Sequence, residues 1–198
     1  MKKEINIAIL GSGNGSNAQR IAEYFKDNSQ IKISTIISNK KDAYIITRAE
    51  NLNIPCRYFN RNDFYNTDNV LNYLKEKEID YVILAGFLWL VPDNLLKAFP
   101  QRIINIHPAL LPNYGGKGMY GSHVHESVIA NKEKESGITI HLVDENYDQG
   151  QTIFQAKCQI NPDDTADTLA QKIHLLEYEY FPKVIEQVVT NQNFNNNQ

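Results

Sequence analysis

The chain has 198 residues, of which 42% are hydrophobic and 22% charged, and its formal net charge is −3. This length and composition favour one globular domain with a sizeable core, and the small negative charge disfavours nucleic acid as a partner. No apolar run reaches the roughly 18 residues of a membrane span, and Met1–Glu4 leads straight into a strand-like run without a signal peptide. We therefore expect a cytoplasmic enzyme or binding protein with no membrane partner.

A glycine-rich turn, Gly11–Asn17, follows the first apolar run of the chain. Ile5–Leu10 before it is typical of a buried strand, and Ala18–Phe25 after it has apolar residues at helical spacing. Strand, glycine turn and helix together favour an anion site. The N–H groups at the helix start face the ligand, and glycine lets the backbone approach it.

The spacing of this turn favours a phosphate monoester over a dinucleotide. Its glycines stand at 11, 13 and 15 with Ser16 next, whereas the dinucleotide fingerprint needs the first, third and sixth positions. The second strand, Ile31–Ser38, also ends without an acidic residue for a ribose. We expect Gly15, Ser16 and Asn17 to bind a phosphate; the alternative is a plain tight turn with Ser16 as the helix cap.

An unusually apolar loop, Gly86–Val91, follows the predicted strand Tyr81–Ala85. Connecting loops normally run over the surface, so this one could line a pocket for a flat aromatic ligand. Packing of Phe87 and Trp89 into the core explains the composition equally well. The elements predicted around it are helices at Lys41–Asn51, Asp68–Glu78 and Pro92–Ala98 and a short strand at Ile54–Phe59.

Two polar side chains stand at the end of the buried strand predicted at Ile103–His107. Asn105 and His107 are two residues apart and so face the same way, and Pro108 ends the strand. Ligands of open α/β sheets bind beyond the carboxyl ends of the strands, so both residues are candidates for chemistry. The alternative is a turn residue and a buried, hydrogen-bonded histidine.

The second half of the chain contains a glycine-rich loop, Gly115–Gly121, whose glycines indicate special dihedral angles or mobility. His123 and His125 are two apart, so on a helix they face different sides, and Cys56 and Cys158 have no metal-type spacing. We therefore expect no metal site. The remaining predicted elements are a helix at Val124–Asn131 capped by Ser122, a hairpin of Ile138–Val143 and Thr152–Ile160, and a helix at Thr165–Val189 that Pro182 kinks or divides.

Together these elements predict an α/β fold. We expect an open, Rossmann-like, mostly parallel sheet with helices on both faces, followed by a C-terminal hairpin and a long helix. Residues 1–189 are predicted to form a single domain and residues 190–198 a polar, frayed tail. Both a monomer and a homodimer fit this pattern.

Four stretches in this order resemble the folate-dependent formyltransferases, from about Ile5 to Val189. Within that family the phosphate turn is most similar to the branch that acts on glycinamide ribonucleotide. The sequence departs from the family pattern at Thr67 and Trp89, where basic residues are common. The four stretches are Gly11–Asn17 (GSGNGSN), Leu84–Phe87 (LAGF), Asn105–Pro112 (NIHPALLP) and Asp148–Gln155 (DQGQTIFQ).

The resemblance implies transfer of the formyl group of 10-formyltetrahydrofolate to the amine of glycinamide ribonucleotide in purine (IMP) biosynthesis. Its catalytic residues would be Asn105, His107 and Asp148, and no metal would be needed. The turn Tyr147–Gly150 is a good turn sequence in its own right, which is the alternative interpretation of Asp148. The resemblance also implies binding roles for Gly15, Ser16, Asn17 and Glu177 toward the ribonucleotide and for Leu88, Trp89, Leu90, Val91 and Asn105 toward the folate.

This chemistry fits the residue types. A tetrahedral intermediate carries a negative oxygen, and preorganised donors such as the Asn105 amide stabilise it by about 3–4 kcal/mol each. His107 would be a charged donor when protonated, and a nearby Asp148 favours that form. Asp148 could also move the amine proton through a water. Alternatives are a formyltetrahydrofolate hydrolase, a transferase acting on charged tRNA or nucleotide sugars, and a nucleotide-binding module without activity.

Overall fold

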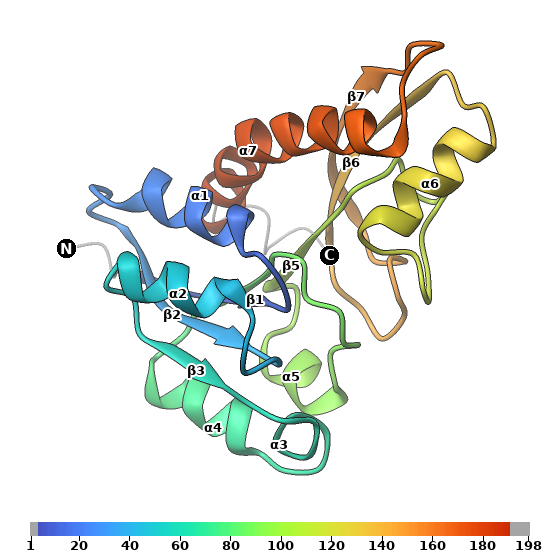
Figure 1. Cartoon of the computed structure of the whole chain (residues 1–198). Helices are drawn as coiled ribbons and strands as arrows, with labels where there is room; N and C mark the ends of the chain where they lie inside the picture. The colour runs from blue at the N-terminus through green and yellow to red at the C-terminus, as the bar shows by residue number, and fades with distance from the viewer. Residues whose placement is uncertain (1–3, 191–198) are drawn as a thin grey trace.

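A seven-stranded sheet organises residues 4–190, the part of the chain that the computed structural model describes (Figure 1). The strand order is β3-β2-β1-β4-β5-β6-β7; the first five strands in this order run parallel, and β6 and β7 are antiparallel to their neighbours. This confirms the predicted mostly parallel sheet with a C-terminal hairpin. The strands are β1 Ile5–Gly11, β2 Ile31–Ser38, β3 Cys56–Tyr58, β4 Tyr81–Leu84, β5 Ile103–His107, β6 Glu135–Leu142 and β7 Thr152–Gln159.

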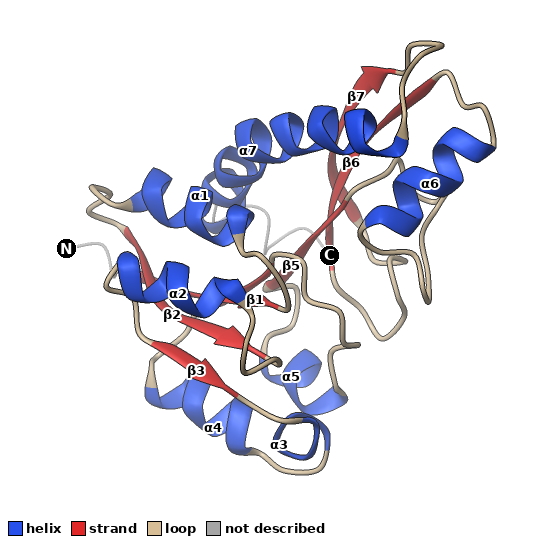
Figure 2. Ribbon diagram, in the orientation of Figure 1, coloured by secondary structure: helices blue, strands red, loops and turns tan. Residues whose placement is uncertain are grey.

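Helices cover both faces of the sheet, because its central strands are apolar on both sides (Figure 2). In β1, Ile7 and Ile9 belong to the core cluster that also contains residues of α1, α2, α6 and α7, whereas Ala8 and Leu10 belong to the cluster with residues of α3, α4 and α5. The helices are α1 Ser16–Phe25, α2 Tyr44–Asn51, α3 Arg61–Tyr65, α4 Asn69–Glu76, α5 Asp93–Ala98, α6 Ser122–Ala130 and α7 Ala166–Thr190.

The strand order reverses between β1 and β4. The chain moves outward from β1 through β2 to β3, and then returns to pair β4 with the other side of β1. The loops that leave β1 and β4 therefore part in opposite directions, and ligands of open α/β sheets bind in the crevice that this leaves. The loop after β5 lies at the same edge.

Helix α3 was absent from the sequence prediction. Its start carries a capping box, in which the Asn60 side chain accepts from the Asp63 N–H at 2.9 Å and the Asp63 carboxylate accepts from the Asn60 N–H at 3.3 Å. Phe64 in this short helix is 1% exposed and anchors it in the core. The Asn-x-x-Asp spacing was the signal that could have revealed it.

We expected Pro182 to kink or divide the last helix; α7 continues through it, so it does not divide the helix. Buried residues on both sides of it, such as Ile173 and Ile185, hold the two halves against the same core. Strand β6 also begins earlier than predicted, at Glu135, because its first residues pair with β7. Thr190 closes α7, and the rest of the predicted tail lies outside the described residues.

Candidate functional site

A cavity of about 660 Å³ opens at the carboxyl ends of β1, β4 and β5. This volume is within the range of about 300–1,000 Å³ that is typical of ligand pockets. Every site residue predicted from the sequence lines it: Gly15, Ser16, Asn17, Leu88, Trp89, Leu90, Val91, Asn105, His107, Asp148 and Glu177.

The glycine turn between β1 and α1 forms one end of the cavity. Gly15 has φ 77°, and a Cβ there would lie 2.6 Å from side-chain atoms of Ile45, so no other residue fits without a shift. Helix α1 begins at Ser16 without a side-chain cap, which excludes the interpretation of Ser16 as the cap. Arg48 holds the turn from outside, because its Nε and Nη2 donate to the backbone and side-chain oxygens of Asn14 at 2.8 and 2.7 Å.

Ser12 joins the glycine turn to the loop after β4. Its N–H donates to the Gly86 carbonyl at 3.0 Å, and its hydroxyl accepts from the Leu88 N–H at 3.0 Å. The side chain is 2% exposed, so the pairing is shielded from water. The two loops are thereby fixed relative to each other, a role for Ser12 that we did not predict.

The loop Gly86–Val91 forms an apolar wall, and both interpretations of its composition hold in part. Phe87 is 9% exposed and packs in the core, whereas Trp89 is half-buried and lines the cavity. Its ring packs against Phe64 and Tyr65, with centroids 5.4 and 5.8 Å away. The Arg61 guanidinium lies 5.7 Å from the Trp89 ring centroid, which places a positive charge beside this wall.

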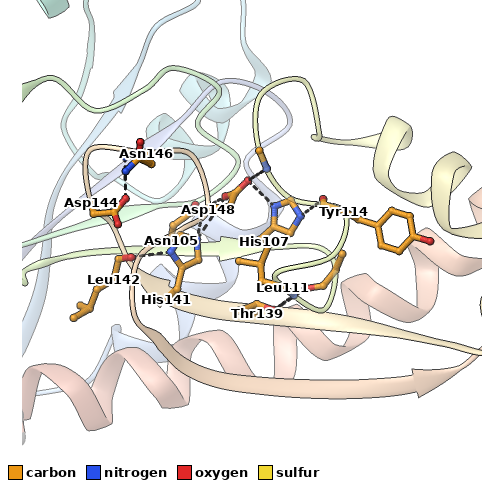
Figure 3. A network of polar contacts seen from close by, with 12 residues as sticks. Asn105, His107, Leu111, Tyr114, Thr139, His141, Leu142, Asp144, Asn146 and Asp148 are labelled. Carbon is orange, nitrogen blue, oxygen red and sulfur yellow. Dashed lines mark hydrogen bonds and ion pairs between the residues drawn. The ribbon is translucent and has the colours of Figure 1, made fainter.

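Asn105, His107 and Asp148 all line the cavity and lie close together (Figure 3). Asp148 Oδ2 lies 3.5 Å from His107 Nδ1, and Asp148 Oδ1 lies 3.5 Å from Asn105 Nδ2. Asp148 lies in the turn that connects β6 and β7, and its side chain faces the end of β5. The structure thus brings together the three residues to which the family resemblance assigns catalysis.

The structure adds His141 to this cluster, which we did not predict. Its Nδ1 donates to the Leu142 carbonyl at 2.7 Å, so its Nε2 is free to accept the Asn105 Nδ2 N–H at 3.0 Å. The same Nε2 lies 3.6 Å from Asp148 Oδ1. His141 faces Asn105 because these two residues are register partners in the antiparallel pair of β5 and β6.

Burial lowers the pKa of His107 below its ordinary value; the charge of Asp148 and the Tyr114 carbonyl offset only part of this effect. Asp148 favours the imidazolium, as we expect from the sequence, but burial is the larger influence and favours the neutral ring. The Nε2–H of the neutral ring donates to the Tyr114 carbonyl at 2.7 Å. Its Nδ1 therefore presents a lone pair to Asp148.

Asp148 is a partly buried carboxylate that stays ionised. Burial alone would raise its pKa, but the neighbouring imidazoles of His141 and His107 and the Gly116 N–H at 2.9 Å hold the pKa below its ordinary value. Asp148 has φ 56°, a region that Asp and Asn tolerate best among residues with a Cβ. Its backbone conformation aims the carboxylate at β5.

Glu177 of α7 is 6% exposed at the end of the cavity near the glycine turn. Its Oε2 accepts from Asn17 Nδ2 at 2.9 Å and from His174 Nδ1 at 2.9 Å. A buried carboxylate thereby ties α7 to the first turn of α1. Glu177 was predicted as a site residue; His174 was not.

The Formyl transferase family model matches residues 5–185. The chain belongs to the formyl transferase family. A phosphoribosylglycinamide formyltransferase of Bacillus subtilis is 36% identical over 194 residues, which cover 96% of this chain and 95% of that protein. A chloroplastic phosphoribosylglycinamide formyltransferase of Arabidopsis thaliana is 37% identical over 185 residues; the match covers 90% of this chain and 63% of the plant protein, so this chain spans less than two thirds of that relative.

The fold agrees with solved structures of the formyl transferase family. The phosphoribosylglycinamide formyltransferase of Anaplasma phagocytophilum superimposes with a TM-score of 0.87 at 32% identity, covering 96% of this chain and 89% of that one. In the present chain, residues 4–190 contain no group of three His, Cys, Asp or Glu side chains that is arranged to hold a metal ion. None of the described helices is long and apolar enough to cross a membrane.

Proposed function

We propose that this chain transfers the formyl group of 10-formyltetrahydrofolate to the primary amine of glycinamide ribonucleotide, a step of purine (IMP) biosynthesis. The observation that carries the proposal is that one cavity brings together the cluster of Asn105, His107 and Asp148, a phosphate-type turn and an apolar wall. The names of the formyl transferase relatives support the same acceptor. Residues 1–189 act as one cytoplasmic domain, as a monomer or a homodimer.

Each substrate has its own part of the cavity. The ribonucleotide phosphate binds the N–H groups of Gly15, Ser16 and Asn17, with the helix dipole of α1 favouring the anion. Glu177 lies next to Asn17 and accepts hydrogen bonds from the ribonucleotide. The pterin of the formyl folate lies along the apolar wall, and no metal takes part. The wall residues are Leu88, Trp89, Leu90 and Val91, and Asn105 stands at their inner end.

The reaction is direct attack. The amine lone pair forms the N–C bond, and the carbonyl π pair moves onto oxygen. The proton that the amine loses enters the space between His107 Nδ1 and Asp148 Oδ2, which are 3.5 Å apart. The neutral imidazole and the ionised carboxylate are both acceptors before the reaction. When the intermediate collapses, the C=O bond reforms, the bond to folate N10 breaks, and N10 takes up that proton.

Asn105 stabilises the oxyanion. One N–H of its Nδ2 bonds His141 Nε2 at 3.0 Å, whereas the contact with Asp148 is long, at 3.5 Å. A bond of that length is weak, so this second N–H is the one available to the developing oxygen. Proton capture by His107 adds a positive charge beside the oxyanion at the moment it forms.

Ser16→Asp is expected to raise the KM for the ribonucleotide by at least about tenfold and to leave the KM for the folate nearly unchanged. It places a carboxylate in the first turn of α1, where the phosphate would bind, and like charges repel. Steady-state kinetics with each substrate varied in turn measures both constants. Ser29→Asp, on an exposed surface residue, is the matched control. Equal effects on the two constants would argue against the phosphate assignment.

Trp89→Ala is expected to raise the KM for the formyl folate about five- to tenfold, with a much smaller effect on the ribonucleotide. The indole face would be lost from the wall, and aromatic pairs contribute about 0.5–1.5 kcal/mol beyond burial. Trp89→Phe should recover most of the affinity. A rise in the ribonucleotide KM alone would mean that the two parts of the cavity are assigned the wrong way round.

The acceptor itself tests the proposal. Formyl transfer to glycinamide ribonucleotide should exceed transfer to glycinamide, which lacks the ribose phosphate, by at least about a hundredfold in kcat/KM, because the phosphate anchors the amine beside the cluster. Comparable rates with the two acceptors would show that the turn does not bind the ribonucleotide.

A further inference from the structure

The phosphate turn has few side-chain charges to balance a phosphate. Residues 11–17 contain no lysine or arginine. A phosphate monoester carries about −1.5 to −2 charges at neutral pH. Arg48 lies outside the turn, and its Nε and Nη2 are already used on Asn14. The compensating charge must come from other side chains that line the cavity, among them Lys40 and His174.

His174 lies directly beside the start of α1. Its Nδ1 and the Nδ2 of Asn17, the second residue of α1, bond the same Glu177 oxygen, each at 2.9 Å. The imidazole also stacks on Tyr178, with ring centroids 5.9 Å apart and planes 9° apart. These contacts fix the ring orientation, and within residues 4–190 its Nε2 has no hydrogen-bond partner.

We propose that His174, oriented by Glu177, donates its Nε2–H to the phosphate of the ribonucleotide as an imidazolium and makes ribonucleotide affinity fall at alkaline pH. This inference rests on the proposed function. It adds a specificity-determining residue that distinguishes a phosphorylated acceptor from one without phosphate. Lys40, which lines the same cavity, supplies a second positive charge.

The charges around His174 favour its protonated form. The hydrogen bond with Glu177 raises the pKa of His174 above its ordinary value; burial opposes this, and the Glu177 charge adds to it. The ring is therefore charged at pH values below that raised pKa and loses its charge as the pH rises through it. Facing groups are Glu177 and Tyr178 on α7, Asn17 on α1 and His125 on α6.

His125 provides an independent sign that a ligand belongs here. It is 4% exposed, lines the cavity, and its Nδ1 has no hydrogen-bond partner among the described residues. A buried polar atom without a partner is costly, and a ligand hydroxyl or amine would satisfy it. Burial lowers the pKa of His125, so it is neutral over the alkaline range in which His174 loses its charge.

The test uses ribose 5-phosphate as a probe of the phosphate site, with its Kd measured by calorimetry from pH 6.5 to 9. In the native protein the Kd should rise about tenfold across this range, the size expected for one charge-assisted hydrogen bond. His174→Gln should bind about tenfold more weakly at pH 6.5, with little further change. His174→Lys should bind tightly throughout, and Lys40→Gln should weaken binding without removing the pH dependence.

The same variants are then assayed for formyl transfer. His174→Gln should raise the KM for the ribonucleotide and leave kcat and the KM for the folate nearly unchanged. An unaltered pH dependence of Kd in His174→Gln would overturn the inference, as would a loss of affinity in His174→Lys equal to that in His174→Gln. Transfer activity in the native protein separates the two failures. If the native protein is active and the His174 variants keep its Kd and pH dependence, only the role of His174 is refuted. If the native protein does not transfer the formyl group, the proposed function is refuted.

Discussion

Asp148→Asn is expected to lower kcat at least about a hundredfold, the range that general acid–base catalysis contributes. The amide has the shape of the carboxylate but cannot share the amine proton with His107. It also loses the charge that lies 3.5 Å from His107 Nδ1 and 3.6 Å from His141 Nε2. Single-turnover formyl transfer with both substrates saturating measures the effect on chemistry directly.

Asp148→Asn removes the negative charge of the side chain and is expected to leave the backbone conformation of the turn unchanged. Asp148 has φ 56°, and asparagine tolerates this conformation as well as aspartate does. The amide oxygen of the variant side chain can still accept the Gly116 N–H that Asp148 accepts at 2.9 Å. Asp144→Asn, in the same turn and outside the cluster, is the control for a lost negative charge. Near-normal turnover in Asp148→Asn, with an unchanged melting temperature, would remove Asp148 from the mechanism.

His107→Ala is expected to cause a similar loss, at least about a hundredfold in kcat. The imidazole contributes one of the two acceptors for the amine proton and then a positive charge beside the oxyanion. Its removal leaves Asp148 without one neighbour and leaves the Tyr114 carbonyl without its donor at 2.7 Å. A fall in kcat with little change in either KM would indicate that His107 acts in the transition state.

The control for His107→Ala is His123→Ala. His123 is an exposed histidine of α6 whose side chain pairs with Glu126 and lies outside the cavity lining. Thermal unfolding of both variants shows how much of the effect comes from the space left by His107, which is 3% exposed. A stable His107→Ala protein that turns over within about fivefold of the native rate would exclude the assigned role.

The placement of Asn105 and His107 could be predicted because it depends on local rules. Side chains two apart in a strand face one way, and ligands of open α/β sheets bind at the carboxyl ends of strands. The same rules located the glycine turn and the apolar wall. Only the family resemblance predicted that Asp148 shares a site with Asn105 and His107, because the sequence of a turn does not indicate which strand the turn faces.

His141 and His174 could not be found in this way, since their roles depend on register and packing. His141 meets Asn105 because β5 and β6 pair with these two residues opposite each other. His174 reaches the phosphate turn because α7 packs across α1 and Glu177 bridges the two helices. Both arrangements join residues that are far apart in the sequence.

The direction of the pKa shift of His107 could not be predicted from the sequence for a related reason. The sequence indicated a neighbouring carboxylate, which favours the charged ring. It did not reveal how deeply the strand end is buried, and burial is the larger influence on the pKa of His107. The consequence is a neutral acceptor in the resting site, ready to take the amine proton.

The most direct test of the central claim follows folate product by absorbance, with 10-formyltetrahydrofolate present and glycinamide ribonucleotide either added or omitted. We expect product only when the ribonucleotide is present, in an amount equal to the formylated ribonucleotide formed. Equal product without the ribonucleotide would contradict the account and identify water as the acceptor, as in a hydrolase. No product in either case would also contradict it, because the cluster of Asn105, His107 and Asp148 would then not transfer this formyl group.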